Sequence, residues 1–341
     1  MKKRSLIAIV SMLVVAFTLI SCTVAGNATE AASVKTGLGI VAGFTSSKEA
    51  TQDADGTAQI DATFVAVTVD AEGKIVKAAI DVYQAKVKFD ATGKITSDLT
   101  AKTLTKRQLL EGYNMKPASP IGKEWYEQAA AFEAYVVGKT LAEIEAIEVD
   151  EGNHPVAEDI RAGTTMSIGD FKAALKLAVE SAQDLGAKAT DKLGLATEID
   201  LAERSKDATA DADGVAYAYS YYAAVTVGED GKITSDVLNA SQFQVKFTAE
   251  GKYSTDLTAP QFDKLTLKDG YNMRGASPIG KEWFEQADFF SKYVIGKTVE
   301  EISAIEVDEG NHPVAEDIRA GTTVSIGSFQ ATLAEAAADA K

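Results

Sequence analysis

Two stretches of the chain gather hydroxyl side chains directly after a glycine. Residues 158–169 read EDIRAGTTMSIG and residues 316–327 read EDIRAGTTVSIG, so one residue differs. Each stretch stands just before a segment predicted to be a helix. A glycine lets the backbone approach a ligand closely, and the N–H groups at a helix N-terminus attract a phosphate. The pattern predicts a phosphate-binding loop, and a helix start capped by its own hydroxyls is the structural alternative.

The repeated stretch belongs to a tandem duplication with a period of 158 residues. Three further segments align at that offset: VTV at 67–69 with 225–227, GYNM at 112–115 with 270–273, and SPIGKEW at 119–125 with 277–283. Residues 148–169 match the second copy at 21 of 22 positions, whereas residues 55–66 have diverged widely. This uneven divergence indicates that the loop is under a constraint that the early strands do not share. We expect two homologous domains, at 37–184 and 190–341, joined near 184–192.

Each copy begins with strand signals. Residues 62–69 and 74–83 are rich in β-branched side chains and flank DAEGK, a hairpin connection that carries Gly73. Gly231 fills the same place in the second copy. DADG, at 53–56 and 211–214, lacks the other ligands of a calcium loop and predicts a turn.

Helix signals follow the strands. Apolar residues at helical spacing end at a glycine in both copies: Trp125, Ala129, Phe132, Val136 and Gly138, and Trp283, Ala287, Phe290, Val294 and Gly296. TLAE at 140–143 and TVEE at 298–301 have capping-box spacing, and a last helix is expected near Asp170 or Ser328. Strands before helices predict an α+β fold, in which each domain is an antiparallel sheet with packed helices.

The N-terminus carries an export signal. Three basic residues precede an apolar run over 6–20, which predicts a secretory signal peptide at 1–21. The ending Leu-Ile-Ser-Cys resembles the lipobox of bacterial lipoproteins, which implies cleavage before Cys22 and its lipidation. A transmembrane anchor is the alternative, although the run is shorter than the roughly 20 residues of a span. Residues 22–36 are small and polar, and predict a tether.

Charge and composition exclude several classes of function. The formal net charge is −16, and loss of the three basic residues of the signal makes it −19. Such a surface repels nucleic acid and anionic headgroups. The expected location is therefore the outer face of the cell membrane, held by the lipid anchor rather than by a basic patch. Cys22 is the only cysteine, so no disulfide is expected within the chain.

Common catalytic motifs are missing from the sequence. It has no Walker loop, no nucleophile elbow, no zinc-type Cys/His spacing and no His-Glu-x-x-His. His154 and His312 are its only histidines and occupy one equivalent position in EGNHPV. We therefore predict no metal site and no classical enzyme pocket.

The residues Asp159-x-x-Ala162-Gly163-Thr164-Thr165-x-Ser167 resemble the Asp-x-x-Ser/Thr-Gly-Ala-Thr-x-Ser/Thr motif of FMN-binding domains. The resemblance covers most of both repeats and implies two FMN groups, each joined through its phosphate to a motif threonine by a dedicated flavin transferase. The chain departs from the motif at Ala162, where Ser or Thr is usual, and at Thr164, where Ala is usual. A second hydroxyl therefore competes for the role of acceptor.

The resemblance gives a set of candidate cofactor-binding residues. The preferred acceptors are Thr165 and Thr323, and the other motif positions are Thr164, Thr322, Gly163, Gly321, Ser167, Ser325, Asp159 and Asp317. Residues that could contact the flavin ring are Tyr113, Tyr271, Asn114, Asn272, His154 and His312. Trp125 and Trp283 could stack on the ring, but they begin apolar helical stripes, which favours core packing.

Lipobox, tether and two such domains together resemble the flavin-bearing lipoproteins that serve extracellular electron transfer in Gram-positive bacteria. The resemblance implies an electron carrier that takes electrons from a quinone-linked membrane donor and passes them to extracellular acceptors. We expect two similar, separately loaded sites. The alternative is a solute-binding or adhesion-type surface lipoprotein, and the apolar signal segment could also release a pheromone peptide.

Overall fold

The computed structural model describes residues 31–341, so the predicted signal peptide, Cys22 and most of the predicted tether lie outside the described residues. Six strands form two three-stranded antiparallel sheets, in the orders β1-β2-β3 and β4-β5-β6. Their bounds are β1 Lys35–Gly43, β2 Gly56–Val69, β3 Ile75–Phe89, β4 Lys192–Asp200, β5 Gly214–Val227 and β6 Ile233–Phe247. One sheet comes from each repeat, and the α+β prediction with antiparallel sheets is confirmed at this level.

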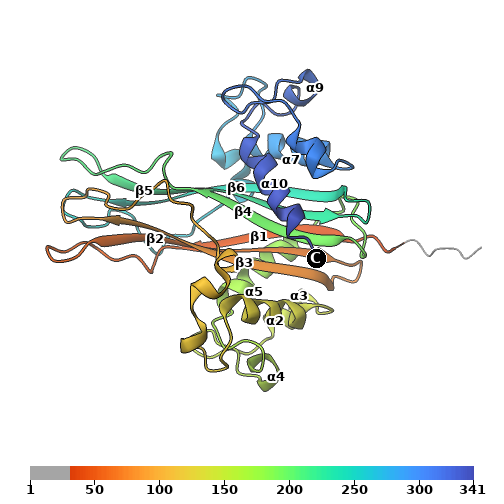
Figure 1. The fold of residues 1–341 in the computed structure, drawn as a ribbon, viewed down its shortest axis with the longest axis horizontal. Helices are drawn as coiled ribbons and strands as arrows, with labels where there is room; N and C mark the ends of the chain where they lie inside the picture. The colour runs from red at the N-terminus through yellow and green to blue at the C-terminus, as the bar shows by residue number, and fades with distance from the viewer. Residues whose placement is uncertain (1–30) are drawn as a thin grey trace, which may run out of the picture. The chain divides into compact units, whose positions relative to one another are not determined.

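Helices follow the sheet in each repeat (Figure 1). In the first half they are α1 Lys106–Leu109, η1 Leu110–Tyr113, η2 Lys116–Ala118, α2 Trp125–Val136, α3 Leu141–Glu145, α4 Glu158–Arg161 and α5 Gly169–Ser181. In the second half they are α6 Lys264–Leu267, η3 Lys268–Tyr271, α7 Trp283–Val294, α8 Val299–Ser303, α9 Glu316–Arg319 and α10 Gly327–Ala338. None of the helices within residues 31–341 combines the length and the apolar character needed to span a membrane.

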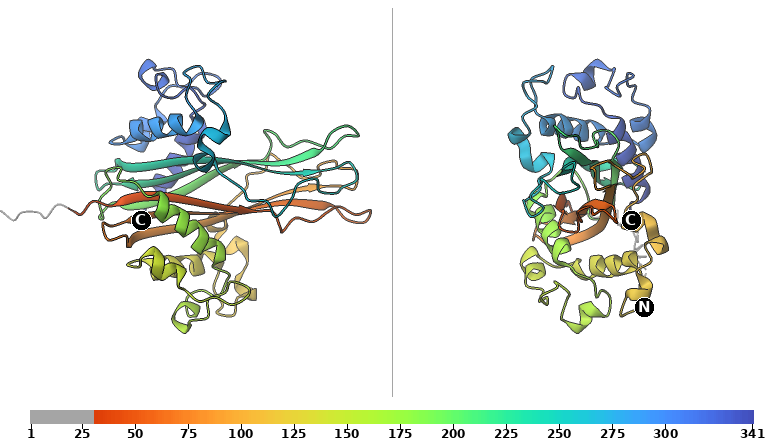
Figure 2. Two further views of the ribbon diagram at one scale, coloured as in Figure 1. Left: turned by 180° about the vertical axis from the view of Figure 1, so that it is seen from behind. Right: turned by 90° about the vertical axis from the view of Figure 1, so that its left-hand side faces the viewer.

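The strands β2 and β5 are buried on both faces. Along β2, Ile60, Ala62 and Phe64 point to the opposite sheet, whereas Val65 and Val67 point to α2 and α5. This explains the nearly continuous run of apolar and small residues, because alternate side chains of a strand enter different cores. The result is four layers, helices, sheet, sheet and helices, and Figure 2 shows the two groups of helices on opposite sides.

The two repeats share the central core. Side chains from both sheets meet there, and the ring of Phe89 stacks on that of Phe247 with centroids 4.1 Å apart. A buried hydroxyl network crosses the same interface, in which the hydroxyls of Tyr83 and Tyr222 lie 3.3 Å apart and Ser220 donates to Tyr83. Residues 31–341 accordingly form one compact unit. The predicted junction falls between the end of α5 and the start of β4.

Local signals read from the sequence appear where expected. Gly73 and Gly231 close the hairpins with φ of 78° and 77°, a conformation that favours glycine. Thr140 and Thr298 form the predicted capping boxes of α3 and α8. Strand β1 begins at Lys35, inside the segment expected to be a tether.

The last helix of each repeat lies against the first strand at very short range. A Cβ built on Gly37 would lie 1.9 Å from the carbonyl oxygen of Ala178 in α5, and one built on Gly194 would lie 1.8 Å from that of Ala336 in α10. The glycines in these strands therefore allow the helices that follow the motif loops to pack directly on the sheets.

We predict that Gly37→Ala lowers the free energy of unfolding by about 3 kcal/mol, because a methyl group forces the backbones of β1 and α5 apart. Urea denaturation measures this change. The matched control is Gly43→Ala in the same strand, where an added Cβ meets nothing within 4 Å. The control should stay within about 0.5 kcal/mol of the unsubstituted protein, and an equal loss in both variants would contradict the packing argument.

Candidate functional site

A buried glutamine in the second turn of α2 and of α7 holds each motif loop. The Oε1 of Gln128 accepts the N–H of Thr165 at 2.8 Å, and the Oε1 of Gln286 accepts that of Thr323 at 2.7 Å. The threonine hydroxyls also donate to these oxygens, at 3.3 and 3.2 Å. Each predicted acceptor threonine is thus fixed through both its backbone and its side chain.

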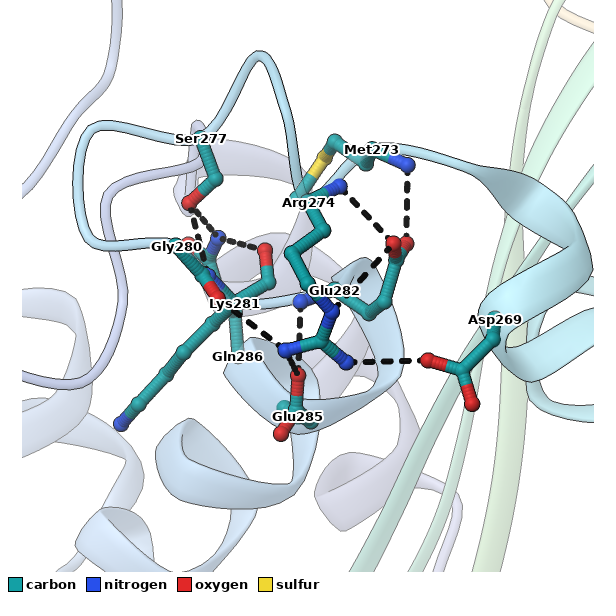
Figure 3. Close-up of polar contacts among 9 residues, drawn as sticks. All are labelled: Asp269, Met273, Arg274, Ser277, Gly280, Lys281, Glu282, Glu285 and Gln286. Atoms are coloured by element: carbon teal, nitrogen blue, oxygen red, sulfur yellow. Dashed lines mark hydrogen bonds and ion pairs between the residues drawn. The ribbon is translucent and has the colours of Figure 1, made fainter.

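The other end of the same amide holds the SPIG turn. The Nε2 of Gln286 donates to Ser277 Oγ at 3.0 Å and to the carbonyl of Lys281 at 3.2 Å, as Figure 3 shows. Gln128 makes the equivalent bonds to Ser119 and Lys123. Since a buried primary amide needs partners for its donors and its acceptor, the glutamine locks turn and motif loop together.

The segment after GYN joins the same helix start through a glutamate. Glu282, the N-cap of α7, accepts the N–H groups of Met273 and Arg274, both at 2.8 Å. The guanidinium of Arg274 reaches Asp269 and Glu285 (Figure 3). The first half repeats the glutamate bonds with Glu124. The start of α2 or α7 therefore connects all three strongly repeated segments.

The two threonines of each pair have different environments. Thr164 and Thr322 are 1% and 0% exposed. Thr322 donates to the carbonyl of Gln286 at 2.7 Å, whereas the Thr164 hydroxyl has no hydrogen-bond partner among the described residues. Thr165 and Thr323 are half-buried. Only the second threonine of each pair is partly exposed.

The motif hydroxyls do not cap the helices that follow. Helices α5 and α10 have Ile168 and Ile326 as N-caps, without a side-chain cap hydrogen bond. The structural alternative for this Ser/Thr-rich stretch is therefore wrong, and the hydroxyls of Thr165, Thr322 and Thr323 bond to α2 or α7 instead.

The motif glycines serve packing within each half. A Cβ on Gly163 would lie 2.8 Å from Ala131 Cβ, and one on Gly321 would lie 2.2 Å from the ring of Phe289. Neither glycine has a positive φ. The close backbone approach expected here is thus made to α2 and α7.

His312 and Arg319 line a hollow beside Thr323 of the motif. It has a volume of about 450 Å³ and is lined by Pro278, Asp308, His312, Pro313, Val314, Arg319 and Thr323. The loop that carries the histidine is tied to the motif because Ile326 N–H donates to the Asn311 carbonyl at 2.8 Å.

Each histidine is oriented by an aspartate four residues earlier. His312 Nδ1 lies 3.1 Å from Asp308 Oδ1, and His154 Nδ1 lies 3.1 Å from Asp150 Oδ1. The backbone N–H of each histidine, bonded to the same carboxylate, lowers the pKa of Asp308 and of Asp150. This contact leaves Nε2 of each imidazole available to a ligand.

Arg161 and Arg319 were not among the residues predicted for the site. Both are exposed, and neither forms an ion pair within residues 31–341. Arg319 lines the hollow together with Thr323. A free guanidinium beside a reachable hydroxyl suits a phosphate ester. The signal was present in the sequence, since both arginines lie inside the nearly identical repeated stretch.

Other predicted residues have local structural roles. Asp159 and Asp317 lie in the first turns of α4 and α9 and accept the N–H of the next residue, at 2.9 and 3.0 Å. Ser167 is exposed and Ser325 is half-buried.

The GYNM residues do not line the hollow beside Thr323. Asn114 and Asn272 adopt left-handed φ values of 58° and 59°, which asparagine tolerates better than most residues. The hydroxyls of Tyr113 and Tyr271 donate to glutamines of β3 and β6, at 3.4 and 3.3 Å.

The two halves differ in the charged residues near the aromatic side chains that were expected to contact the flavin ring. Lys264 is 2% exposed and lies 4.4 Å from the ring centre of Tyr271 and 4.9 Å from that of Trp283. Its Nζ donates to Tyr219 at 2.7 Å, and burial lowers the pKa of this lysine to about 7. In the first half Lys106 is half-buried and Asp61 replaces the tyrosine. The two sites were expected to be similar, but the charged residues around them differ.

No protein-family model matches the chain, and no solved structure matches it. Among curated proteins the chain is similar to "Chlorophenol reductase" of Desulfitobacterium hafniense, with 32% identity over 120 residues. The alignment covers 32% of this chain and 36% of the relative, so the chain spans about a third of the length of that relative.

We predict that Gln286→Ala lowers the free energy of unfolding by about 3 kcal/mol, because the N–H of Thr323 loses its acceptor and the Ser277 hydroxyl and the Lys281 carbonyl lose their donor. Faster amide hydrogen exchange at Thr323 should accompany the loss. Gln244→Ala, at an exposed position of β6, is the control and should change neither quantity. Unchanged exchange at Thr323 in Gln286→Ala would mean that the glutamine does not hold the loop.

Proposed function

We propose that the protein is a redox carrier that bears two covalent FMN groups, joined by phosphoester bonds to Thr165 and Thr323. The observation that carries the proposal is the hollow in which the half-buried Thr323 hydroxyl lies with the unpaired Arg319 and the aspartate-oriented His312. The first half repeats the hydrogen bonds of the acceptor threonine and of the histidine, at Thr165 and His154. The residues present therefore fit a phosphorylated cofactor.

Each group near the threonine has a distinct role in this proposal. Gln286 holds the backbone and hydroxyl of Thr323, which fixes the direction in which the oxygen is presented. Arg319 neutralises the phosphate charge, and His312 supplies a hydrogen bond through Nε2. FMN, when bound, supplies one- and two-electron transfer.

Formation of the ester requires an external enzyme and an activated donor. On the flavin transferase, the threonine oxygen forms a bond to the phosphorus of the flavin donor, and the bond from that phosphorus to the donor's leaving group breaks. The hydroxyl proton passes to a base, and the leaving group is released with the electron pair of the broken bond. A covalent bond suits an exported carrier, because a dissociable cofactor would be lost to dilute surroundings, whereas a tethered one stays at high effective concentration.

The similarity to a protein named as a reductase supports the redox assignment in general terms. We further propose that the carrier is exported, anchored through a lipid on Cys22 at the outer face of the membrane, and relays electrons from a quinone-linked membrane donor to extracellular acceptors. The redox and anchoring proposals can fail independently, and each has its own test.

We predict that protein produced with a flavin transferase carries two FMN masses that survive denaturation. Thr165→Val and Thr323→Val should each retain one, and the double variant none, because each hydroxyl is a separate acceptor. Intact mass with a visible spectrum measures this. Thr164→Val and Thr322→Val are the matched controls and should keep both groups, since these hydroxyls are buried. Release of all flavin on denaturation would refute the covalent bond.

We predict that Cys22→Ala abolishes the acyl mass and moves the protein from the membrane fraction to the soluble exported fraction. The reason is that membrane attachment depends on the lipid. Mass spectrometry of the N-terminal peptide and fractionation measure both effects. Membrane retention of the variant, together with an unacylated parent protein, would exclude the anchor.

A further inference from the structure

A second cleft lies between the halves and does not include the motif threonines, although Phe289 in its wall also lies against Gly321 of the motif. Its walls come from the segment 180–185 at the end of α5, and from β6, α6 and α7 of the second half. Its volume is about 1060 Å³, which is ample for a small organic ligand. Apolar side chains form much of the wall: Leu185, Val237, Leu238, Leu265, Phe284, Phe289 and Ile295.

One carboxylate in this wall lacks a hydrogen-bond partner. Asp236 of β6 is 2% exposed, and neither of its oxygens accepts a hydrogen bond among the described residues. The Ser291 hydroxyl lies near it but outside hydrogen-bonding geometry, and burial raises the pKa of Asp236 to about 7. An unpaired carboxylate costs stability in such a place.

The fold does not require this carboxylate. The equivalent position in the first half is Ala78, at the same register of β3. Asp236 is therefore an addition to the second half that makes folding less favourable, and a buried polar group of this kind calls for a partner.

The equivalent cleft of the first half already contains its own cation. Arg107 forms an ion pair with Glu133 and donates to the carbonyl of Ile80 at 3.1 Å. In the second half the arginine and the glutamate are replaced by Leu265 and Ser291. The first cleft also contains the buried carboxyl of Asp81, where the second half has Asn239. The second cleft thus keeps one buried acid, Asp236, and none of the residues that line it is a buried base.

The remaining charges of the second cleft lie nearer its rim. Its other acidic residues and its lysines are exposed or half-buried. Lys292 pairs with Asp288 at 2.7 Å, and Glu285 pairs with Arg274 at 3.0 Å. Among the residues that line the cleft, Asp236 is thus the only ionisable one that is buried.

The aromatic side chains also favour a cation. Phe284 and Phe289 line the cleft, and the Nζ of Lys281 already lies 5.4 Å from the ring centre of Phe289. Aromatic faces attract ammonium groups.

We propose that this cleft binds an organic cation, an ammonium group on an apolar body, with the ammonium paired to Asp236 and the body against Phe284, Phe289 and Leu265. The site is separate from the motif threonines, so its occupancy does not depend on the flavin proposal. The ammonium pairs with Asp236 as Arg107 pairs with Glu133 in the first half.

Three probes of one shape test the charge requirement on the full-length protein: 2-phenylethylammonium, 2-phenylethanol and phenylacetate. Calorimetry should show saturable binding of the ammonium, binding of the alcohol at least 10-fold weaker, and no binding of the anion. Asp236→Asn keeps the shape and removes the charge, so it should weaken ammonium binding at least 10-fold. Asp288→Asn, which removes a rim charge, is the control and should bind within threefold of the parent protein.

The stability of the protein without ligand gives an independent test of the role of Asp236. When the pKa of a carboxyl is raised by folding, the free energy of unfolding of the protein falls as the pH increases from the unfolded pKa of that group to its folded pKa. Asp236→Ala should therefore raise the melting temperature, and more at pH 8.5 than at pH 5.5. Equal binding of the alcohol or the anion, unchanged ammonium binding by Asp236→Asn, or no ammonium binding at millimolar concentration would each overturn the proposal.

Discussion

The arrangement of each candidate site depends on one buried amide. Gln128 and Gln286 satisfy donors and acceptors from two loops that are far apart in sequence, the SPIG turn and the motif loop. An apolar residue would leave these backbone groups unpaired, and a charged one would satisfy only part of them. Because the glutamine lies on a helix packed against the sheet, the position of the threonine hydroxyl is fixed by the core rather than by a flexible loop.

The second constraint is the shared core of the two repeats. Both sheets need cover on two faces, and each repeat supplies helices for only one. The inner face of one sheet is therefore covered by the other sheet, which makes the duplication one folding unit. This packing also creates clefts to which both halves contribute, and a duplicated sequence need not fill them in the same way.

Divergence between the halves is concentrated where it changes electrostatics without changing the fold. The diverged strand segment places Tyr219 beside Lys264 in one half, and Asp61 occupies the position equivalent to Tyr219 in the other. Asp236 and Ala78 occupy the same register of equivalent strands. The sequence predicted two similar sites, because these substitutions lie far from the motif in sequence.

Sequence patterns located much of the candidate site but not its supporting contacts. Thr323 and His312 meet at one hollow, as their common stretch indicated. Gln286 and Arg319 were overlooked, although both lie in segments repeated between the copies. Polar residues on amphipathic helices are usually exposed, so spacing alone could not show that Gln286 points inward and is fully buried.

The sequence by itself determined the features that depend on neighbouring residues. Hairpin glycines, capping boxes and the apolar period of α2 and α7 are encoded within a few positions, and short-range sterics and hydrogen bonds are enough to set them. Only the tertiary structure decided that Thr165 and Thr323 are reachable while Thr164 and Thr322 are buried, and that the repeats share a core. Those outcomes depend on which distant surfaces pack together, and a local sequence pattern does not specify the distant segment that it will contact.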